Sequence, residues 1–199
     1  MKTALNWSRR HFIGGLAASG AALSCGWPRA AAWASTTVAP AESLRVVFYT
    51  DIHGRLEWET PAAMSLAAGR INDQKADLVL CGGDLITEGF QHSEAAVEPR
   101  WDAYLESMHR QIQPAVHTVL GNHDLVAAMP EDGGPALADP RGPFLRHLGL
   151  PRTYGSFDAS GYHFVLLDSL DITHDKLKYR GWIGDEQMAW LKEDLARVD

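Results

Sequence analysis

The chain has little cysteine and no long apolar run. Of its 199 residues only Cys25 and Cys81 are cysteines. Cys25 lies in a predicted leader, so the mature chain would keep one cysteine, which excludes an intramolecular disulfide and leaves the cellular compartment open. No apolar stretch approaches the roughly 20 residues that a membrane-spanning helix needs. The sequence therefore predicts no transmembrane segment.

Positive charge is also scarce once the start of the chain is set aside. The net charge is -7, and the first 34 residues hold four basic residues and no acidic one. Without them 14 basic residues face 25 acidic ones, so the mature chain would be near -11. This excess disfavours binding to nucleic acid or to an anionic membrane. An anionic substrate stays open, because bound metal ions reverse the local field.

The first 34 residues have the three parts of an export signal in order. Arg9 and Arg10 are followed by Phe12, then by the small and apolar stretch 15–26, and Ala32-Trp33-Ala34 ends the segment. A basic start, an apolar middle and an A-x-A end are typical of a secretory signal peptide. The paired arginines resemble the twin-arginine type. We therefore expect residues 1–34 to be removed after transport by the twin-arginine export machinery, which predicts a periplasmic or extracellular protein.

One alternative concerns Cys25. Ala22-Leu23-Ser24-Cys25 partly resembles a lipoprotein cleavage box, although Ala22 stands where a large aliphatic residue is usual. Lipid anchoring at Cys25 is thus the less favoured alternative. Residues 35–43, with Pro40 and several small residues, are typical of a linker, and residues 44–199 form one predicted domain.

The first half of that domain alternates strands and helices. Apolar runs predict strands at 44–50, 78–81 and 116–120, and helical spacing of apolar residues predicts helices at 61–75 and 93–112, with Pro99 as an alternative start of the second. Strand, helix, strand, helix, strand is the order of an α/β protein with a parallel sheet and right-handed crossovers.

The second half has a different pattern. Residues 125–143 hold four prolines and three glycines and predict a long loop, and 144–148 predicts a helical turn. Residues 154–158 and 162–168 predict a β-hairpin, and a last amphipathic helix begins near Gly184.

Each of the three predicted strands of the first half runs into a polar cluster. The clusters are Asp51-Ile52-His53-Gly54, Gly82-Gly83-Asp84 and Gly121-Asn122-His123-Asp124. In open α/β sheets ligands bind at the carboxyl ends of the strands. Oxygen and imidazole ligands suit divalent metal ions. The clusters together predict a metal site at one edge of the sheet.

Four side chains are the predicted metal ligands. Asp51 and His53 are two residues apart, which on an extended chain places both on one side. Asp84 has two carboxylate oxygens and can bridge two ions, and Asn122 offers a neutral amide oxygen.

Two further residues of the third cluster have a different predicted role. His123 follows Asn122 directly, and neighbours in an extended chain point to opposite sides. His123 is therefore predicted to face substrate rather than metal. Asp124 would hold its imidazole in one tautomer.

In this order the three clusters resemble the first three motifs of the calcineurin-like metallophosphoesterases. Gln187 ahead of Trp190-Leu191 also resembles a helix of the family's cyclic-nucleotide phosphodiesterase-like branch. The resemblance covers residues 44–199. It implies an α/β fold in the form of a four-layer α/β/β/α sandwich that holds two divalent metal ions, such as Mn, Fe or Zn.

The resemblance also implies a function. The protein would hydrolyse a phosphodiester or phosphomonoester, a small phosphorylated substrate such as a nucleotide, with a metal-activated hydroxide at a dinuclear site. Asp124 would orient His123, which would donate to the phosphoryl oxygens or protonate the leaving group. The implied metal ligands are Asp51, His53, Asp84 and Asn122.

Two departures from the family pattern change these expectations. The family's later motifs, a lone His and then Gly-His-x-His, do not follow Asp124, because His147, His163 and His174 lack those contexts. We therefore expect a domain that is incomplete at its C-terminus, with weak metal binding and little activity in the 199 residues alone. Thr87 stands where purple acid phosphatases carry tyrosine, so no iron–tyrosinate colour is expected.

Two other functions remain open. Residues 51–56 also resemble the start of exported 5′-nucleotidases, although Asn122-His123-Asp124 differs from their Asn-His-Glu and no second substrate domain is present. The other is a non-catalytic binding protein left by truncation.

Several residues outside the clusters have a weaker predicted role. Lys176, Lys178 and Arg180 lie before the last helix, where an ordinary solvated connection is favoured over a phosphate-steering loop. For Trp58 and Trp182, packing is favoured over a place in the wall of a substrate cleft. The histidines His92, His109 and His117 are expected to be structural or exposed.

Overall fold

The structure is a computed structural model that describes residues 43–173 and 175–198. The predicted signal peptide and almost all of the predicted linker lie outside the described residues, as does His174. None of the helices in the described segments combines the length and the apolar character that crossing a bilayer requires.

A three-stranded parallel sheet forms the centre of the molecule. Strands β1 (Val46–Tyr49), β2 (Leu78–Cys81) and β3 (Val116–Thr118) lie in the order β1-β2-β3. Helices α1 (Thr60–Asp73) and α2 (Glu94–Ser107) connect them. The three strands and two crossover helices expected from the sequence are confirmed.

The second helix ends earlier than predicted. It stops at Ser107, and a separate 3-10 turn, η1 (His109–Gln111), follows. Pro99 lies inside α2 rather than at its start. A proline at this place removes one intrahelical hydrogen bond. The packing of the buried face of the helix, which includes Trp101 and Tyr104, compensates for that loss.

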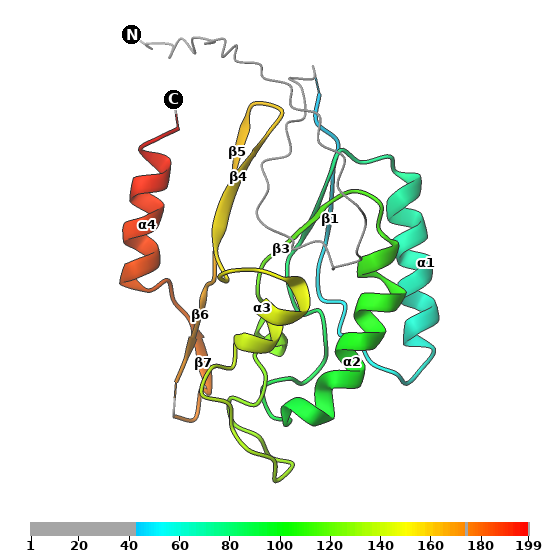
Figure 1. The fold of residues 1–199 in the computed structure, drawn as a ribbon, viewed down its shortest axis with the longest axis vertical. Helices are drawn as coiled ribbons and strands as arrows, with labels where there is room; N and C mark the ends of the chain where they lie inside the picture. The colour runs from blue at the N-terminus through cyan, green and yellow to red at the C-terminus, as the bar shows by residue number, and fades with distance from the viewer. Residues whose placement is uncertain (1–42, 174, 199) are drawn as a thin grey trace, which may run out of the picture.

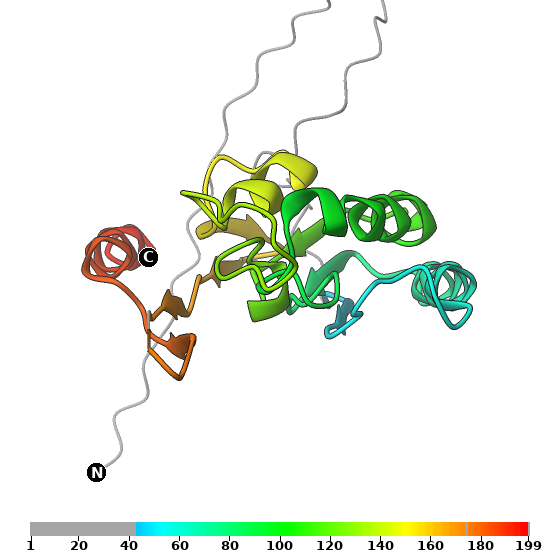
Figure 2. The same cartoon turned by 90° about the horizontal axis from the view of Figure 1, so that it is seen from below.

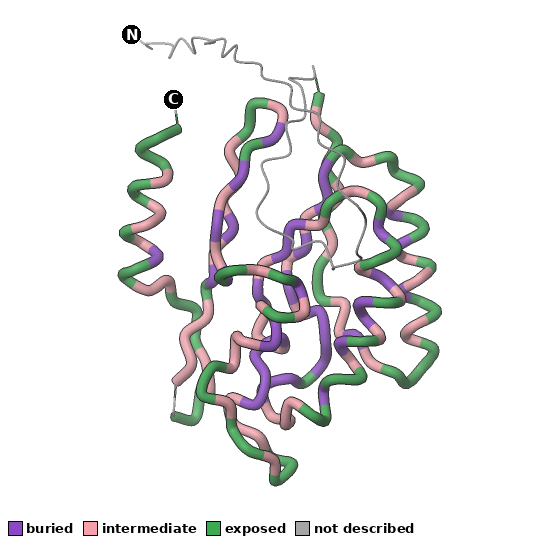
Figure 3. The backbone as a smooth tube through the Cα atoms, viewed as in Figure 1, coloured by how far each residue is buried: buried purple, intermediate pink, exposed green. Residues whose placement is uncertain are grey.

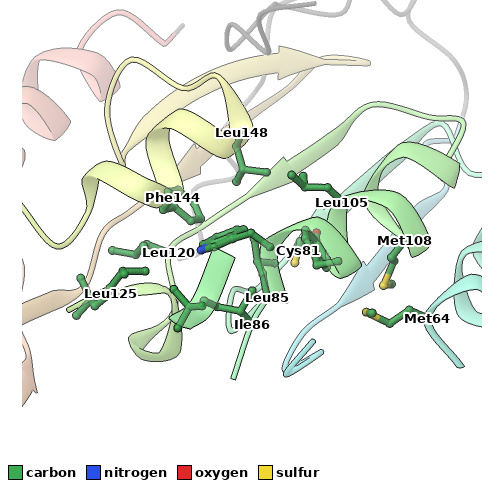
Figure 4. Close-up of a cluster of buried hydrophobic side chains, with 14 of the residues drawn as sticks. Met64, Cys81, Leu85, Ile86, Leu105, Met108, Leu120, Leu125, Phe144 and Leu148 are labelled. Carbon is green, nitrogen blue, oxygen red and sulfur yellow. The ribbon is translucent and has the colours of Figure 1, made fainter. Parts of the chain in front are cut away.

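One face of the sheet packs against the two helices. Val79 and Cys81 of β2 point to this side and join a core that includes Trp101 and Tyr104 of α2, all of them almost fully buried. Figure 4 shows Cys81 in this core beside Leu85, from the segment after β2. Each large apolar side chain that is buried contributes about 1.5–3 kcal/mol to the free energy of folding. This core therefore holds the helices on the sheet.

The other face packs against the predicted hairpin. Strands β4 (Gly155–Ala159) and β5 (Tyr162–Leu166) pair antiparallel around a two-residue turn. Leu78 and Leu80, which alternate with the helix-facing residues of β2, pack with Phe157 of β4. The hairpin is therefore a second β layer.

This second layer leaves β1 uncovered. Phe48, Leu80 and His117 lie side by side across the three strands. His117 is buried and stacks on Phe157 with ring centroids 3.7 Å apart, whereas Phe48 is 64% exposed. Burial lowers the pKa of His117 to about 4, so this histidine is neutral and structural, as expected.

Helix α4 (Asp185–Leu195) lies outside the hairpin and completes the layer order helix, sheet, hairpin, helix (Figures 1 and 2). Asp194 joins the two layers, because it accepts hydrogen bonds from Ser156 (2.8 Å) and His163 (2.9 Å). The other ring nitrogen of His163 contacts Asp158 at 2.7 Å. The hydrogen bonds to Asp158 and Asp194 raise the pKa of His163, which favours an imidazolium that holds both carboxylates.

A second, unpredicted hairpin follows the first. Strands β6 (Leu170–Ile172) and β7 (Tyr179–Gly181) pair antiparallel. In this region Lys178 pairs with Glu131 (2.9 Å) and Arg180 with Asp171 (2.8 Å). Because both cations already have carboxylate partners, the segment is better described as a paired structural element than as a phosphate-steering loop.

The predicted loop 125–143 contains no helix or strand before Gly142, where helix α3 (Gly142–Leu148) begins. Its first residues are buried rather than exposed. Figure 3 shows that buried positions concentrate in the interior of the molecule, between the outer helices. Leu125, Val126 and Ala127 are fully buried in the main core. The loop therefore fixes the segment that follows the third polar cluster.

Candidate metal centre

The pairing of β1 with β2 continues past the ends of the strands. Within the sheet each residue of β1 pairs with the residue 32 positions later, and an isolated bridge between Gly54 and Ile86 keeps the same offset. The backbone N–H of His53 donates to the carbonyl of Asp84 at 2.9 Å. The first and second polar clusters are therefore side by side.

Three of the predicted ligands have an unusual backbone conformation. Asp51, His53 and Asp84 have φ values of 55°, 49° and 54°. Side chains other than glycine occupy this left-handed region rarely, and such residues concentrate at functional sites. Asp51 and His53 do come close, but through these turns rather than through the extended chain that the sequence suggested.

Two glycines let the third cluster approach the second. Gly83 has φ +94°, and a Cβ on Gly121 would lie 2.2 Å from both the backbone nitrogen and Oδ1 of Asp84. No side chain fits at that distance, so glycine is required at position 121.

The ligand atoms have the spacing of groups around a shared ion. His53 Nε2 is 3.8 Å from Asp51 Oδ1 and 3.9 Å from Asp84 Oδ2. These separations are too long for hydrogen bonds. Two ligands about 2.1 Å from one ion are at most about 4.2 Å apart. The separations of His53 from Asp51 and Asp84 meet this limit, so these three donors fit a divalent ion. His123 lies beside them, with one atom each of His53, Asp84 and His123 within 4.8 Å of one another.

Asn122 is oriented by a residue that the sequence analysis missed. Its side-chain nitrogen donates to the hydroxyl of Tyr179 at 3.1 Å, which leaves Oδ1 to bind an ion. Tyr179 lies on β7, and its ring packs edge-on against Phe90 with centroids 5.6 Å apart. The alternation of apolar and polar residues in 170–172 and 179–181 was the signal for this hairpin, and it was too short to stand out.

Asp124 is fully buried and binds backbone rather than a side chain. Its carboxylate accepts N–H groups from Leu85 (2.7 Å), Asp84 (2.9 Å), Gly121 (2.9 Å) and Ile86 (3.3 Å). It thereby joins the segment after β2 to the segment after β3.

The predicted contact between Asp124 and the imidazole of His123 was therefore wrong. The physical reason is that four converging N–H groups satisfy the carboxylate completely. Burial raises the pKa of Asp124 to about 7, while the N–H groups of Gly121 and Leu85 lower it. Ions bound beside it would favour the carboxylate further.

His123 has a different partner. Its Nδ1 accepts the backbone N–H of Glu88 at 2.9 Å, so the proton of a neutral ring is on Nε2. Burial lowers the pKa of His123, and Asp84 opposes that effect. Its ring meets that of His53 edge-on, with centroids 4.5 Å apart. The chain here is a 3-10 turn, η2 (Asn122–Asp124), so the predicted alternation of an extended chain does not apply.

The structure thus gathers all six predicted residues at the carboxyl edge of the sheet. A comparison with protein-family profiles matches residues 44–196 to the calcineurin-like phosphoesterases. The chain belongs to this family. Family membership confirms the resemblance drawn from the three polar clusters.

Curated relatives of this calcineurin-like phosphoesterase include two plant enzymes. Purple acid phosphatase 23 of Arabidopsis thaliana is 31% identical over 114 residues, which is 51% of this chain and 21% of that protein. Purple acid phosphatase 15 of the same plant is 32% identical over 106 residues, 51% of this chain and 18% of that protein. The chain therefore spans about a fifth of the length of either relative.

A solved structure agrees on the fold. The purple acid phosphatase PPD1 from yellow lupin seeds matches with a TM-score of 0.50 and 20% identity, over 78% of this chain and 28% of that one. The predicted α/β fold of the metallophosphoesterase type is thereby confirmed.

Proposed function

We propose that this calcineurin-like phosphoesterase is an exported enzyme that hydrolyses a small phosphomonoester or phosphodiester with two divalent ions. The observation that carries the proposal is that His53 Nε2 lies 3.8 Å from Asp51 Oδ1 and 3.9 Å from Asp84 Oδ2 at the carboxyl edge of the sheet. Family membership supplies the reaction class.

The chain's own residues divide into two sets of ligands. Asp51, His53 and Asp84 would hold the first ion, and Asp84 with Asn122 would hold the second. When bound, the ions supply Lewis-acid polarisation of the phosphoryl group and lower the pKa of water to near neutral. Among the described residues, the second ion would have fewer ligands than the first.

His123 serves substrate in this proposal. Its Nδ1 lone pair accepts the backbone N–H of Glu88, so in the neutral ring Nε2–H is the donor. That donor can stabilise phosphoryl oxygens or give its proton to the leaving group. Asp124 acts at a distance, by holding the two segments that carry Asp84 and His123 together.

The cyclic-nucleotide branch has weaker support. Gln187, part of the motif that suggested this branch, is buried. Its Oε1 accepts the backbone N–H of Asp168 at 2.8 Å, and its Nε2 donates to the carbonyl of Asp168 at 2.7 Å. The motif therefore anchors α4 and does not indicate a substrate. The 5′-nucleotidase-like alternative rests on residues 51–56 alone.

The test is metal-dependent turnover by the protein as its gene encodes it. We expect hydrolysis of p-nitrophenyl phosphate or bis(p-nitrophenyl) phosphate that chelator abolishes and Mn, Fe or Zn restores. The solution should show no tyrosinate absorption in the visible range, because Thr87 replaces the tyrosine. A metal-loaded protein without turnover on either ester would support the non-catalytic binding protein instead.

Export is the second part of the proposal, and its motive is the ordered leader in residues 1–34. Changing Arg9 and Arg10 to lysine should retain a longer precursor in the cytoplasm. N-terminal sequencing of the exported protein should give a start near Ser35. A start at Cys25 would indicate the lipoprotein, and an exported protein that begins at Met1 would exclude a cleaved signal.

A further inference from the structure

Arg55 stands beside the metal centre with only neutral partners. Its Nη2 donates to the hydroxyl of Thr87 at 3.1 Å and its Nε to the carbonyl of His53 at 3.4 Å. Among the described residues no carboxylate lies within ion-pair distance of it. An arginine has five N–H donors in a planar fork. Three of them have no partner in the described part of the chain.

The sheet register fixes this position. Arg55 and Thr87 are 32 residues apart, the same offset that pairs β1 with β2 and Gly54 with Ile86. The backbone N–H of Thr87 also donates to the carbonyl of Gly54 at 3.2 Å. Arg55 therefore continues the edge that carries the first two polar clusters.

The position is also tied to the candidate donor of the site. Thr87 is followed by Glu88, whose N–H binds the ring of His123. On the other side Arg55 is two residues after His53. The guanidinium thus bonds to both segments, the one that carries His53 and the one that leads to Glu88.

The ring of Trp58 packs against the guanidinium of Arg55. The arginine carbon Cζ is 4.6 Å from the centroid of the Trp58 ring, a cation–π distance. Trp58 is 82% exposed, and both Trp58 and Glu59 have φ 58°. The strained turn before α1 therefore places a large aromatic ring on Arg55 instead of in the core.

We propose that Arg55 is a substrate-binding residue, which pairs with phosphoryl oxygens and gives the enzyme a preference for phosphomonoesters over phosphodiesters. The inference rests on the proposed function. A planar fork matches two phosphoryl oxygens. A monoester carries nearly two negative charges at neutral pH, since its second pKa is about 6. A diester carries one, so an additional cation favours the monoester.

The test compares binding with turnover in the metal-loaded natural protein. Calorimetry with inorganic phosphate should show a dissociation constant about 10–100-fold weaker in Arg55→Met, because a charge-assisted hydrogen bond is lost. Arg55→Lys, which keeps the charge without the fork, should lose less than about tenfold. In turnover, Arg55→Met should lower kcat/KM at least about fivefold more for p-nitrophenyl phosphate than for bis(p-nitrophenyl) phosphate.

Arg110→Met is the matched control. Arg110 is exposed, and among residues 43–173 and 175–198 its ion-pair partner is Glu106, at 3.8 Å, so the same loss of charge there should leave phosphate binding unchanged. Equal phosphate affinity in Arg55→Met and wild type, with equal metal content, would overturn the proposal. A wild-type protein that binds no phosphate would overturn it too. Phosphate binding that depends on Arg55 without any turnover would support it while refuting the proposed catalytic function.

Discussion

Replacing Asp124 with alanine is expected to destabilise the protein by about 3–5 kcal/mol. Four buried N–H groups converge on this carboxylate, from Asp84, Leu85, Ile86 and Gly121. Alanine would leave all four without a partner and would separate the segments after β2 and β3. The change in free energy of unfolding is measured by urea denaturation.

Two further variants make this prediction sharper. Asp124→Asn keeps one oxygen acceptor but places an amide NH2 group opposite the remaining N–H donors. We therefore expect it to lower the free energy of unfolding by about 1–3 kcal/mol. Asp102→Ala, an exposed carboxylate on α2, is the control and should stay within about 0.5 kcal/mol of wild type. Near-wild-type stability of Asp124→Ala would show that the backbone contacts are unimportant and would reopen its predicted role beside His123.

Replacing His123 with alanine should lower kcat by roughly 10²–10⁴-fold, the effect of losing a general acid. Metal content should stay near normal, because the Nδ1 lone pair is used by Glu88 and the protonated Nε2 is a donor. The loss should be smaller for a good leaving group such as p-nitrophenolate, which needs little protonation.

The dependence on leaving group separates the two roles of His123. If its Nε2–H stabilises phosphoryl oxygens instead, good and poor leaving groups should lose activity equally. Elemental analysis beside kinetics on two leaving groups decides between them. Loss of bound metal in His123→Ala would contradict the assignment, and His123 would then join His53 and Asp84 as a ligand.

The sequence was sufficient to locate the site because strand order and motif order coincide. Apolar runs at β1, β2 and β3 each end in a polar cluster, and parallel strands bring their carboxyl ends to one edge. That the polar side chains of the three clusters lie at one edge could be predicted without knowing the backbone. The left-handed conformation of Asp51, His53 and Asp84 could not, since it depends on contacts between segments.

What the sequence left open involves partners that are distant in the chain. Asp124 binds N–H groups about 40 residues earlier, and a carboxylate next to a histidine does not reveal that choice. Tyr179 reaches Asn122 from a hairpin whose strands are three residues long. Arg55 is visible in the sequence, but its lack of a carboxylate partner is a property of the folded, described chain.

The most direct test of a dinuclear phosphoesterase is the metal content and turnover of Asp84→Asn beside wild type and Asn122→Ala. Asp84 would contact both ions and its charge offsets their repulsion, whereas Asn122 would contact one. In the natural protein we expect about two divalent ions per wild-type chain, a loss of both ions and of hydrolysis in Asp84→Asn, and a smaller loss in Asn122→Ala. Two ions and undiminished hydrolysis in Asp84→Asn would contradict the account.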